Sequence, residues 1–355
     1  MINTKRMQPA DEESFSRPSA GLAFSGNRQD LLHRFTSTPY NAKLSIMGNT
    51  VRIESNSRTI VDKAVQFFER YQGQSSGPPD FLWRIVGEAT AQKHTDGVEL
   101  AAFSDHALRF ANIGQKSFLA VDLHAREAVA FIDDGYIESE PLVHCRPLFD
   151  TLYCMCASSF GKVAMEAACV GNSEKGVLIF GPPNSGKTTT SYLAAKLGLE
   201  FHADQGVFLE MQSGRLQAWG DLMPAIFRAA ALHFLPELRA STRRYSYPSF
   251  TVHYLSKRPF QSSIAHPIRP VGCVFLNRGD TFQTTLLPVA AQERMQRLLD
   301  GILYREDGDF EDQTLRIIES LCNVPSYELA FSDPAAAAVQ IRELLLHSEP
   351  ALKWC

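Results

Sequence analysis

The stretch Gly181-Pro182-Pro183-Asn184-Ser185-Gly186-Lys187-Thr188 matches the pattern G-x-x-x-x-G-K-[ST] of a phosphate-binding loop. Its glycines let backbone N–H groups turn toward a phosphate without a Cβ in the way. Lys187 adds a positive charge suited to the β- and γ-phosphates, and the Thr188 hydroxyl can bind Mg²⁺. We therefore expect this phosphate loop, with Thr189 beyond it, to bind ATP and Mg²⁺, with Thr188 as a metal ligand and Lys187 as a catalytic cation.

The residues on both sides of the phosphate loop fit this interpretation. Val177–Phe180 is a short apolar run between glycines, which predicts a buried strand. Thr188–Leu197 predicts a helix that ends at Gly198, so bound phosphates would lie at a helix N-terminus. The residues expected on the buried side of this helix are Leu193, Ala194 and Leu197.

Composition places the chain in a broad class. It has 355 residues, of which 45% are hydrophobic and 21% charged, typical of a soluble protein with two domains. A net charge of −4 gives no general attraction to nucleic acid or to an anionic membrane, and no apolar run reaches the ~18 residues of a membrane span. The seven cysteines form no C-x-x-C pair, which favours reduced thiols and a cytoplasmic location. The sequence leaves the oligomeric state open, a homo-oligomer included.

We expect an α/β (α+β) chain with three parts. Residues 1–28 are polar and predict a disordered tail. Residues 29–140 contain short alternating strands, which predict a mostly antiparallel α+β module. Residues 141–350 hold the phosphate loop and predict a nucleotide-binding domain with a mixed sheet.

The segment before the phosphate loop predicts a hairpin. Ala164–Val170 is apolar apart from Glu166, and the turn at Gly171–Gly176 leads directly into the strand before the loop. Ordinary phosphate-loop proteins instead reach this strand through a crossover connection. Farther along the chain, we expect a helix at Pro224–Leu238.

A kinase site also needs a carboxylate near Mg²⁺ and the acceptor hydroxyl. Asp204 is the best candidate, because it lies at the end of the short apolar segment after the loop helix. A motor ATPase would instead carry an acid directly after a later apolar strand. The run Val271–Leu276 is followed by Asn277, which counts against that class.

Three pieces of the sequence resemble the core of the HPr kinase/phosphorylase family, which shares its nucleotide-binding core with phosphoenolpyruvate carboxykinase. They are Glu166–Val170, Gly176–Gly181 with the loop, and Phe201-His202-Ala203-Asp204. The resemblance covers about residues 145–345. It implies a phosphate loop in a mixed sheet fed by a hairpin, with Asp204 acting near Mg²⁺ and the attacking hydroxyl.

The chain departs from that family at three points. Gln205 stands where relatives carry a second acid, and Glu166 stands where they often carry His. Nothing resembles the Arg-Gly-Ile-Gly signature of true HPr kinases. We therefore expect a divergent member. Glu166 has two interpretations: a second catalytic acid, or a side chain that points away and pairs with a neighbouring base.

Basic residues are frequent between Arg228 and Arg269, with tyrosines among them. This pattern is compatible with a nucleic-acid surface, but it favours a flap that clamps phosphate or an acidic substrate. Arg243 and Arg244 are the candidates for stabilising a transferring phosphoryl group.

The sequence predicts an ATP-dependent kinase that phosphorylates a Ser or Thr hydroxyl on a small protein or peptide. The alternatives are a small-molecule kinase and a nucleotide-binding protein without turnover.

Overall fold

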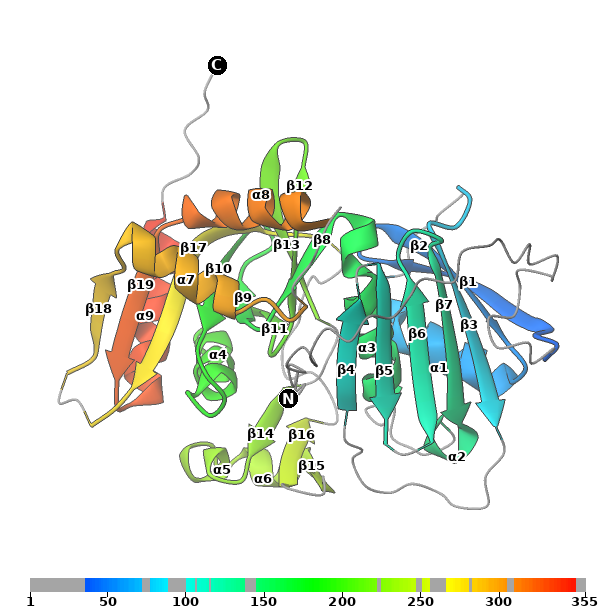
Figure 1. The fold of residues 1–355 in the computed structure, drawn as a ribbon. Coiled ribbons are helices and arrows are strands. Elements are labelled where there is room, and N and C mark those ends of the chain that lie inside the picture. The colour runs from blue at the N-terminus through cyan, green and yellow to red at the C-terminus, as the bar shows by residue number, and fades with distance from the viewer. Residues whose placement is uncertain are drawn as a thin grey trace, which may run out of the picture.

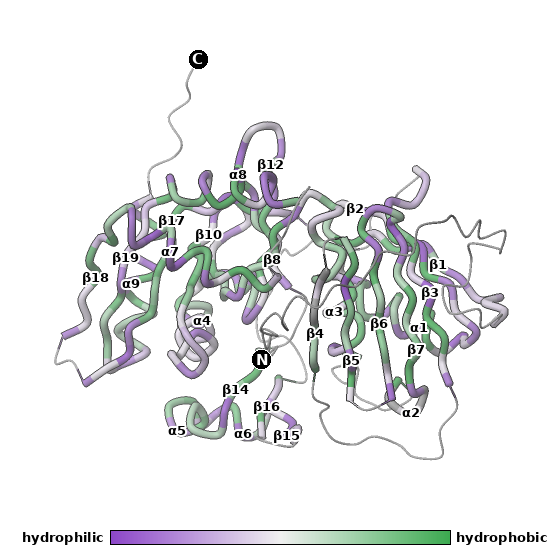
Figure 2. The backbone as a smooth tube through the Cα atoms, viewed as in Figure 1, coloured by the Kyte–Doolittle hydropathy of each residue, from purple (hydrophilic) through white to green (hydrophobic). Residues whose placement is uncertain are grey.

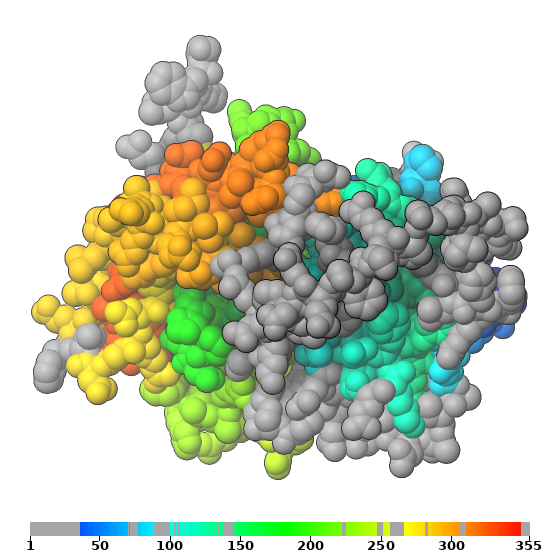
Figure 3. Space-filling view, viewed as in Figure 1, coloured from blue at the N-terminus to red at the C-terminus, as the bar shows by residue number. Residues whose placement is uncertain are grey.

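The structure is a computed structural model in which two units lie side by side (Figures 1 and 3). One unit contains a seven-stranded sheet and the other a mixed six-stranded sheet with the phosphate loop. The expected tail at 1–28 lies outside the described residues. Those residues are 36–71, 77–88, 100–105, 107–114, 116–137, 145–221, 225–246, 251–255, 266–280, 283–304 and 310–348.

The seven-stranded sheet is mostly antiparallel, as the sequence predicts. Two neighbouring pairs, β2–β3 and β3–β7, are parallel, and the other neighbours pair antiparallel. Figure 2 shows the hydrophobic residues along β6 and β7. In sheet order the strands are β1 (Tyr40–Ile46), β2 (Asn49–Ser55), β3 (Phe81–Glu88), β7 (Glu127–Asp133), β6 (Ser117–Asp122), β5 (Leu108–Ile113) and β4 (Leu100–Asp105).

Two helices share one hydrophobic core with this sheet: α1 (Arg58–Phe67) and α3 (Arg146–Cys156). Their aromatic residues meet, with Phe68 just after α1 packing against Phe149 of α3. We call the seven-stranded sheet with α1 and α3 the N-terminal unit. Short helical turns complete it at η1 (Glu69–Tyr71), α2 (Asp134–Ile137) and η3 (Ala157–Phe160).

The six-stranded sheet is mixed, which confirms the expected fold class. Its central strands β10, β17 and β19 are parallel, while β9 and β10 form the antiparallel hairpin that leads into the phosphate loop. In sheet order the strands are β11 (Glu200–Ala203), β9 (Ala168–Gly171), β10 (Lys175–Phe180), β17 (Arg269–Arg278), β19 (Ser326–Phe331) and β18 (Thr285–Pro288).

Helices cover both faces of the mixed sheet. Val177 and Ile179 belong to the core that contains residues of α4 (Lys187–Lys196) and α9 (Pro334–His347). Leu178 and Phe180 belong to the core on the opposite face, with α7 (Ala291–Asp300) and α8 (Glu311–Cys322). Because successive side chains enter different cores, β10 reads in the sequence as an unbroken apolar run.

The expected strand Ala164–Val170 is two strands in two sheets. β8 (Lys162–Met165) pairs with β12 (Val207–Gln212), which also pairs with β13 (Arg215–Gly220), whereas β9 belongs to the mixed sheet. The break falls at Glu166, whose N–H donates to the Gly301 carbonyl at 2.7 Å. The one charged residue in the apolar run therefore marks the point where the chain changes sheets.

The expected helix Pro224–Leu238 is wrong in its described part. Ile226–Arg228 forms strand β14, which pairs with β16 (Thr251–Leu255), and only the short helices α5 (Ala231–Phe234) and α6 (Leu238–Ser241) follow. Pro236 separates the two helices because it cannot donate a helical hydrogen bond. β16 also pairs with β15 (Thr242–Ser246), and β14, β16 and β15 form a small sheet that we call the flap sheet.

The buried face of α4 also differs from the expectation. Leu197 is 40% exposed, whereas Thr190, Ser191 and Tyr192 are buried. α4 packs against both β9 and α9, so the small polar residues Thr190 and Ser191 are enclosed between them. The Ser191 hydroxyl donates to the Lys187 carbonyl at 2.7 Å, which satisfies it inside the helix.

Within the described ranges, no helix is long and apolar enough to cross a membrane. Cys154 and Cys156, the most closely spaced cysteines of the sequence, are buried in the core of the N-terminal unit.

Candidate nucleotide-binding site

The phosphate loop joins β10 to α4, and its backbone has the geometry of an anion cradle. Asn184 and Gly186 have positive φ angles of 68° and 101°, which turn the chain sharply before the helix begins. Gly186 is the N-cap of α4 and supplies no side-chain cap. The N–H groups of the first helical turn are therefore available to an anion.

Lys187 lies inside the phosphate loop in this structure. Its Nζ donates to Oε1 of Glu166 at 3.1 Å and also to the Gly181 carbonyl. The Lys187 side chain is only 9% exposed, while that of Glu166 is 42% exposed. Glu166 therefore pairs with a neighbouring base, as the second interpretation held, but that base is the lysine of the phosphate loop, so the side chain does not point away from the candidate site.

Asp204 follows β11 and lies deep beside the phosphate loop. It is 1% exposed, and its Oδ2 accepts the Ile226 N–H at 3.0 Å. Burial raises the pKa of this carboxyl above its ordinary value of 3.8. The Ile226 N–H and the Thr188 hydroxyl oppose that rise, and so do the positive charges of Arg146 and Lys187.

The structure thus brings together Lys187, Thr188, Asp204 and Glu166, the four residues that the sequence singled out around the loop. Within the described residues, Oδ1 of Asp204 and Oγ of Ser185 are buried polar atoms that form no hydrogen bond. A bound group with donors or a cation would satisfy them. A hydroxyl and a carboxylate are also the oxygen ligands that Mg²⁺ uses beside phosphates and water, so the residues present fit Mg²⁺·ATP.

Asp221 is a second buried acid that the sequence reasoning missed. It is 2% exposed, and its Oδ2 accepts the Gly206 N–H at 3.1 Å. It follows β13 just as Asp204 follows β11, so an acid directly after an apolar strand was a usable signal. Near it, Arg146 of α3 donates to Oε1 of Gln205 at 3.0 Å.

Arg243 and Arg244 lie in β15 of the flap sheet and are exposed. In the described part of the chain, neither guanidinium forms a hydrogen bond or ion pair with the phosphate loop. The flap sheet does reach the candidate site, since Ile226 of β14 donates to Asp204 and Phe227 packs edge-on against Tyr192 of α4. Two further basic residues of the stretch between Arg228 and Arg269, Lys257 and Arg258, lie outside the described residues.

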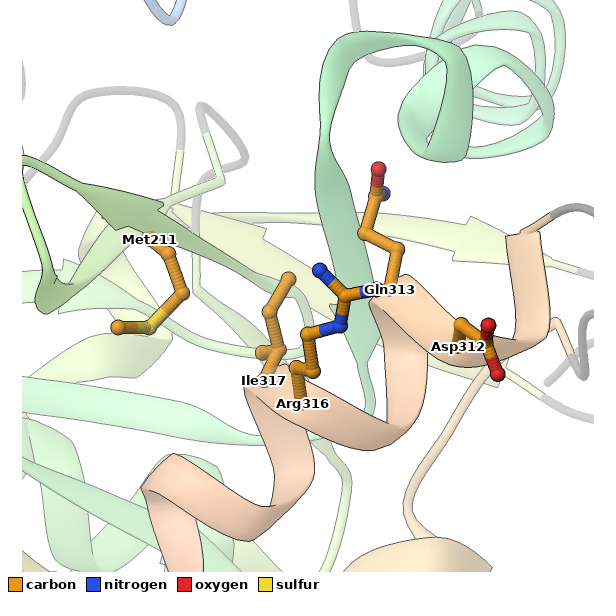
Figure 4. A pocket seen from close by; sticks show the side chains of 5 residues that line it. All are labelled: Met211, Asp312, Gln313, Arg316 and Ile317. Carbon is orange, nitrogen blue, oxygen red and sulfur yellow. The ribbon is translucent and has the colours of Figure 1, made fainter.

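A surface hollow of about 440 Å³ lies away from the phosphate loop, between β12 and α8 (Figure 4). Its lining combines one strand residue with one side of the helix. The lining residues are Met211, Asp312, Gln313, Arg316 and Ile317. None of them belongs to the candidate nucleotide site.

Comparison with known proteins gives a weak likeness at the level of the fold. No family model and no curated protein matches the sequence. Among solved structures, an HPr(Ser) kinase/phosphatase from Coxiella burnetii matches with a TM-score of 0.26 and 12% identity, over 52% of this chain and 90% of that one. A likeness of this size assigns neither a family nor an activity.

Proposed function

We propose that this protein is a Mg²⁺-dependent ATP phosphotransferase whose site is the phosphate loop together with Asp204. The observation that carries the proposal is the convergence of Thr188 and the buried Asp204 at the end of a G-x-x-x-x-G-K-T loop. The loop N–H groups and Lys187 would hold the phosphates, and Thr188 and Asp204 would hold Mg²⁺. ATP would supply the phosphoryl group.

Asp204 suits the role of the group that receives the proton of an acceptor hydroxyl. Burial raises its pKa, which makes the carboxylate a better base than an exposed aspartate, and the positive charges of Arg146 and Lys187 act against that rise. The proposed acceptor is a Ser or Thr hydroxyl on a small protein or peptide. That choice rests on the sequence resemblance around Glu166–Val170 and Phe201–Asp204.

One arrangement favours a second candidate function, nucleotide binding without turnover. Glu166 neutralises Lys187, and the side chain at position 205 is an amide held by Arg146 rather than a second acid. A site whose lysine is neutralised and which lacks a second acid fits nucleotide binding without phosphoryl transfer.

Labelled ATP separates these candidates. Wild type, Lys187→Ala and Asp204→Asn would be incubated with [γ-³²P]ATP, Mg²⁺ and a cell lysate, and Mg²⁺·ATP affinity would be measured by calorimetry. We expect label on one small protein, loss of tight binding in Lys187→Ala, and a fall in transfer by a factor on the order of 10² in Asp204→Asn with binding kept.

Other results would change the conclusion. Label on a metabolite would indicate a small-molecule kinase, and binding without transfer would indicate the second candidate. Unchanged Mg²⁺·ATP affinity in a folded Lys187→Ala protein would contradict the nucleotide site itself.

A further inference from the structure

The segment 204–206 carries the proposed base and wraps around one carboxylate. Its three successive N–H groups point at Asp221: the N–H of Asp204 lies 3.4 Å from Oδ1, that of Gln205 3.4 Å from Oδ2, and that of Gly206 3.1 Å from Oδ2. In return, the Asp221 N–H donates to the Gly206 carbonyl at 3.1 Å. Successive N–H groups around an anion form a nest, and a buried carboxylate holds them more firmly than a neutral acceptor would.

The position of Asp221 is itself fixed by the residue before it. A Cβ on Gly220 would lie 2.0 Å from the His202 carbonyl oxygen, so the end of β13 packs directly on β11 with no room for a side chain. The Tyr71 hydroxyl donates to the Gly220 carbonyl, and its ring packs edge-on against Trp219. Tyr71 belongs to the N-terminal unit, so that unit contacts the residue before Asp221 and helps to fix its position.

The N-terminal unit also contacts the same segment from a second direction. Arg146 of α3 donates to the Gln205 side chain at 3.0 Å and to Oδ2 of Asp150 at 3.3 Å. Its side chain is only 15% exposed. Segment 204–206 therefore lies between a carboxylate that holds its backbone and a guanidinium that holds its side chain.

We propose that Asp221 and Arg146 are positioning residues that clamp segment 204–206 and so hold Asp204 against Thr188. The N-terminal unit, which supplies Arg146 and braces Asp221 through Tyr71, is then part of the working site rather than an independent module. This inference rests on the proposed function for the role of Asp204, but the clamp itself can be measured without turnover.

Amide hydrogen exchange of the full-length protein without nucleotide tests the clamp. Asp221→Ala should speed exchange at residues 204–206 by about tenfold or more, because three N–H groups lose their acceptor. The matched control is Asp133→Ala, a buried acid in the N-terminal unit whose Oδ1 accepts the Gly135 N–H at 3.1 Å. The control should leave exchange at 204–206 unchanged.

Should Asp221→Ala fail to fold, Asp221→Asn takes its place. The amide oxygen of asparagine still accepts N–H groups, so exchange at 204–206 should lie between wild type and the alanine variant. Wild-type exchange there in folded Asp221→Ala would overturn the proposal, and so would equal acceleration by Asp133→Ala.

Kinetics distinguish a positioning role from a purely structural one, because only a positioning role predicts a fall in kcat at an unchanged Kd for Mg²⁺·ATP. Arg146→Ala and Asp221→Asn should each lower kcat about tenfold while the Kd for Mg²⁺·ATP stays within about twofold, since the phosphate loop is untouched. The control for Arg146 is Arg84→Ala, whose side chain is 14% exposed and pairs with Glu54 and Glu127 in the seven-stranded sheet. It should keep wild-type kcat.

Full kcat in folded Arg146→Ala and Asp221→Asn would overturn the positioning role. Wild type that neither binds Mg²⁺·ATP nor transfers phosphate would instead overturn the proposed function. In that case the exchange measurement still decides whether the clamp exists.

Discussion

The Lys187 ammonium and the Glu166 carboxylate form an ion pair at 3.1 Å inside the phosphate loop. Lys187 is the buried partner and Glu166 the half-exposed one, so the pair can open by movement of the glutamate alone. A triphosphate that enters the loop must compete with Glu166 for the lysine. This gives Glu166 an inhibitory effect on binding that its sequence position alone would not predict.

Replacing Glu166 with glutamine should therefore tighten Mg²⁺·ATP binding. Glu166→Gln removes both the competing charge and its repulsion of the phosphates, so we expect the Kd to fall by about three- to tenfold. Calorimetry at moderate salt measures this change. Glu174→Gln, an exposed acid in the β9–β10 turn, is the control and should change nothing. Weaker binding in Glu166→Gln would instead support the interpretation of Glu166 as a second catalytic acid.

The stability of the β8–β12 pair should depend on a buried ion pair. Lys162 is 2% exposed, and its Nζ contacts Oε2 of Glu210 at 2.5 Å and Oδ1 of Asn49 at 2.9 Å. Burial lowers the pKa of Lys162, and Glu210 opposes that shift. Lys162→Met leaves the Glu210 charge without its counter-ion, and should cost about 3–5 kcal/mol in the free energy of unfolding.

An exposed pair of similar geometry is the control for Lys162. Lys196 and Glu237 lie 2.6 Å apart but are 45% and 44% exposed. Lys196→Met should cost about 0–1 kcal/mol because water screens the pair. Denaturant unfolding compares the two variants. Equal losses would show that burial does not set the strength of the Lys162 pair.

The buried cysteines should make the protein lose stability at alkaline pH. Burial raises the pKa values of Cys156 and Cys273 from 9.0 to about 12. Between those values the unfolded thiol has ionised and the folded one has not, so the folded state holds more protons and the free energy of unfolding falls as pH rises. Each thiol lowers the free energy of unfolding by up to about 1.4 kcal/mol per pH unit between the two pKa values, and it has no effect on the slope below them.

Cys273→Ala tests this alkaline effect through the slope of stability against pH above 9. The variant should have a shallower slope than wild type, whatever its stability at neutral pH. Cys322→Ala, which removes a half-buried thiol, should change the slope less. An unchanged slope in Cys273→Ala would mean that this thiol ionises as readily in the folded protein as in the unfolded one.

Sequence patterns predicted the fold wherever one local rule dominated. The apolar run Val177–Phe180 between glycines, followed by Gly-Lys-Thr, determines strand, loop and helix together. The hairpin before it was equally visible, because the turn at Asn172 is short and polar. Around the phosphate loop, residue type and position singled out Lys187, Thr188 and Asp204, which lie close together in the structure, while their roles stay predictions.

The errors arose where long-range contacts outweigh local preference. Ile226–Arg228 looks helical in isolation, but pairing with β16 places it in the flap sheet. The position of Asp221 after an apolar strand marks it as a candidate acid, but no local pattern shows that Asp221 and Arg146 contact segment 204–206 from other parts of the chain. The charge of Glu166 in an apolar run was a signal for the strand break there. No signal in the sequence showed that β8 would pair in a second sheet.

The two adjacent arginines Arg243 and Arg244 lie on opposite faces of the flap sheet, so we expect their substitutions to have different effects. Directly paired residues in antiparallel strands share a face, so Arg244 shares a face with its partner His253, and Arg243 with its partner Tyr254. Phe227, also opposite His253, packs against Tyr192 of α4, so the Arg244 face is the one directed at the loop helix.

The guanidinium of Arg243 is instead engaged by Tyr254. Burial raises the pKa of Tyr254, and a hydrogen bond from Arg243 partly offsets that rise. We therefore expect Arg244→Ala to lower phosphoryl transfer at least about tenfold with Mg²⁺·ATP affinity nearly kept, and Arg243→Ala to lower it less than about twofold. Steady-state kinetics on the two single variants measure the difference. Equal losses in the two variants would mean that the flap sheet acts through its overall charge. A different outcome would support the nucleic-acid interpretation of this surface: wild type retards generic DNA or RNA in a salt-dependent way, and both variants abolish that retardation.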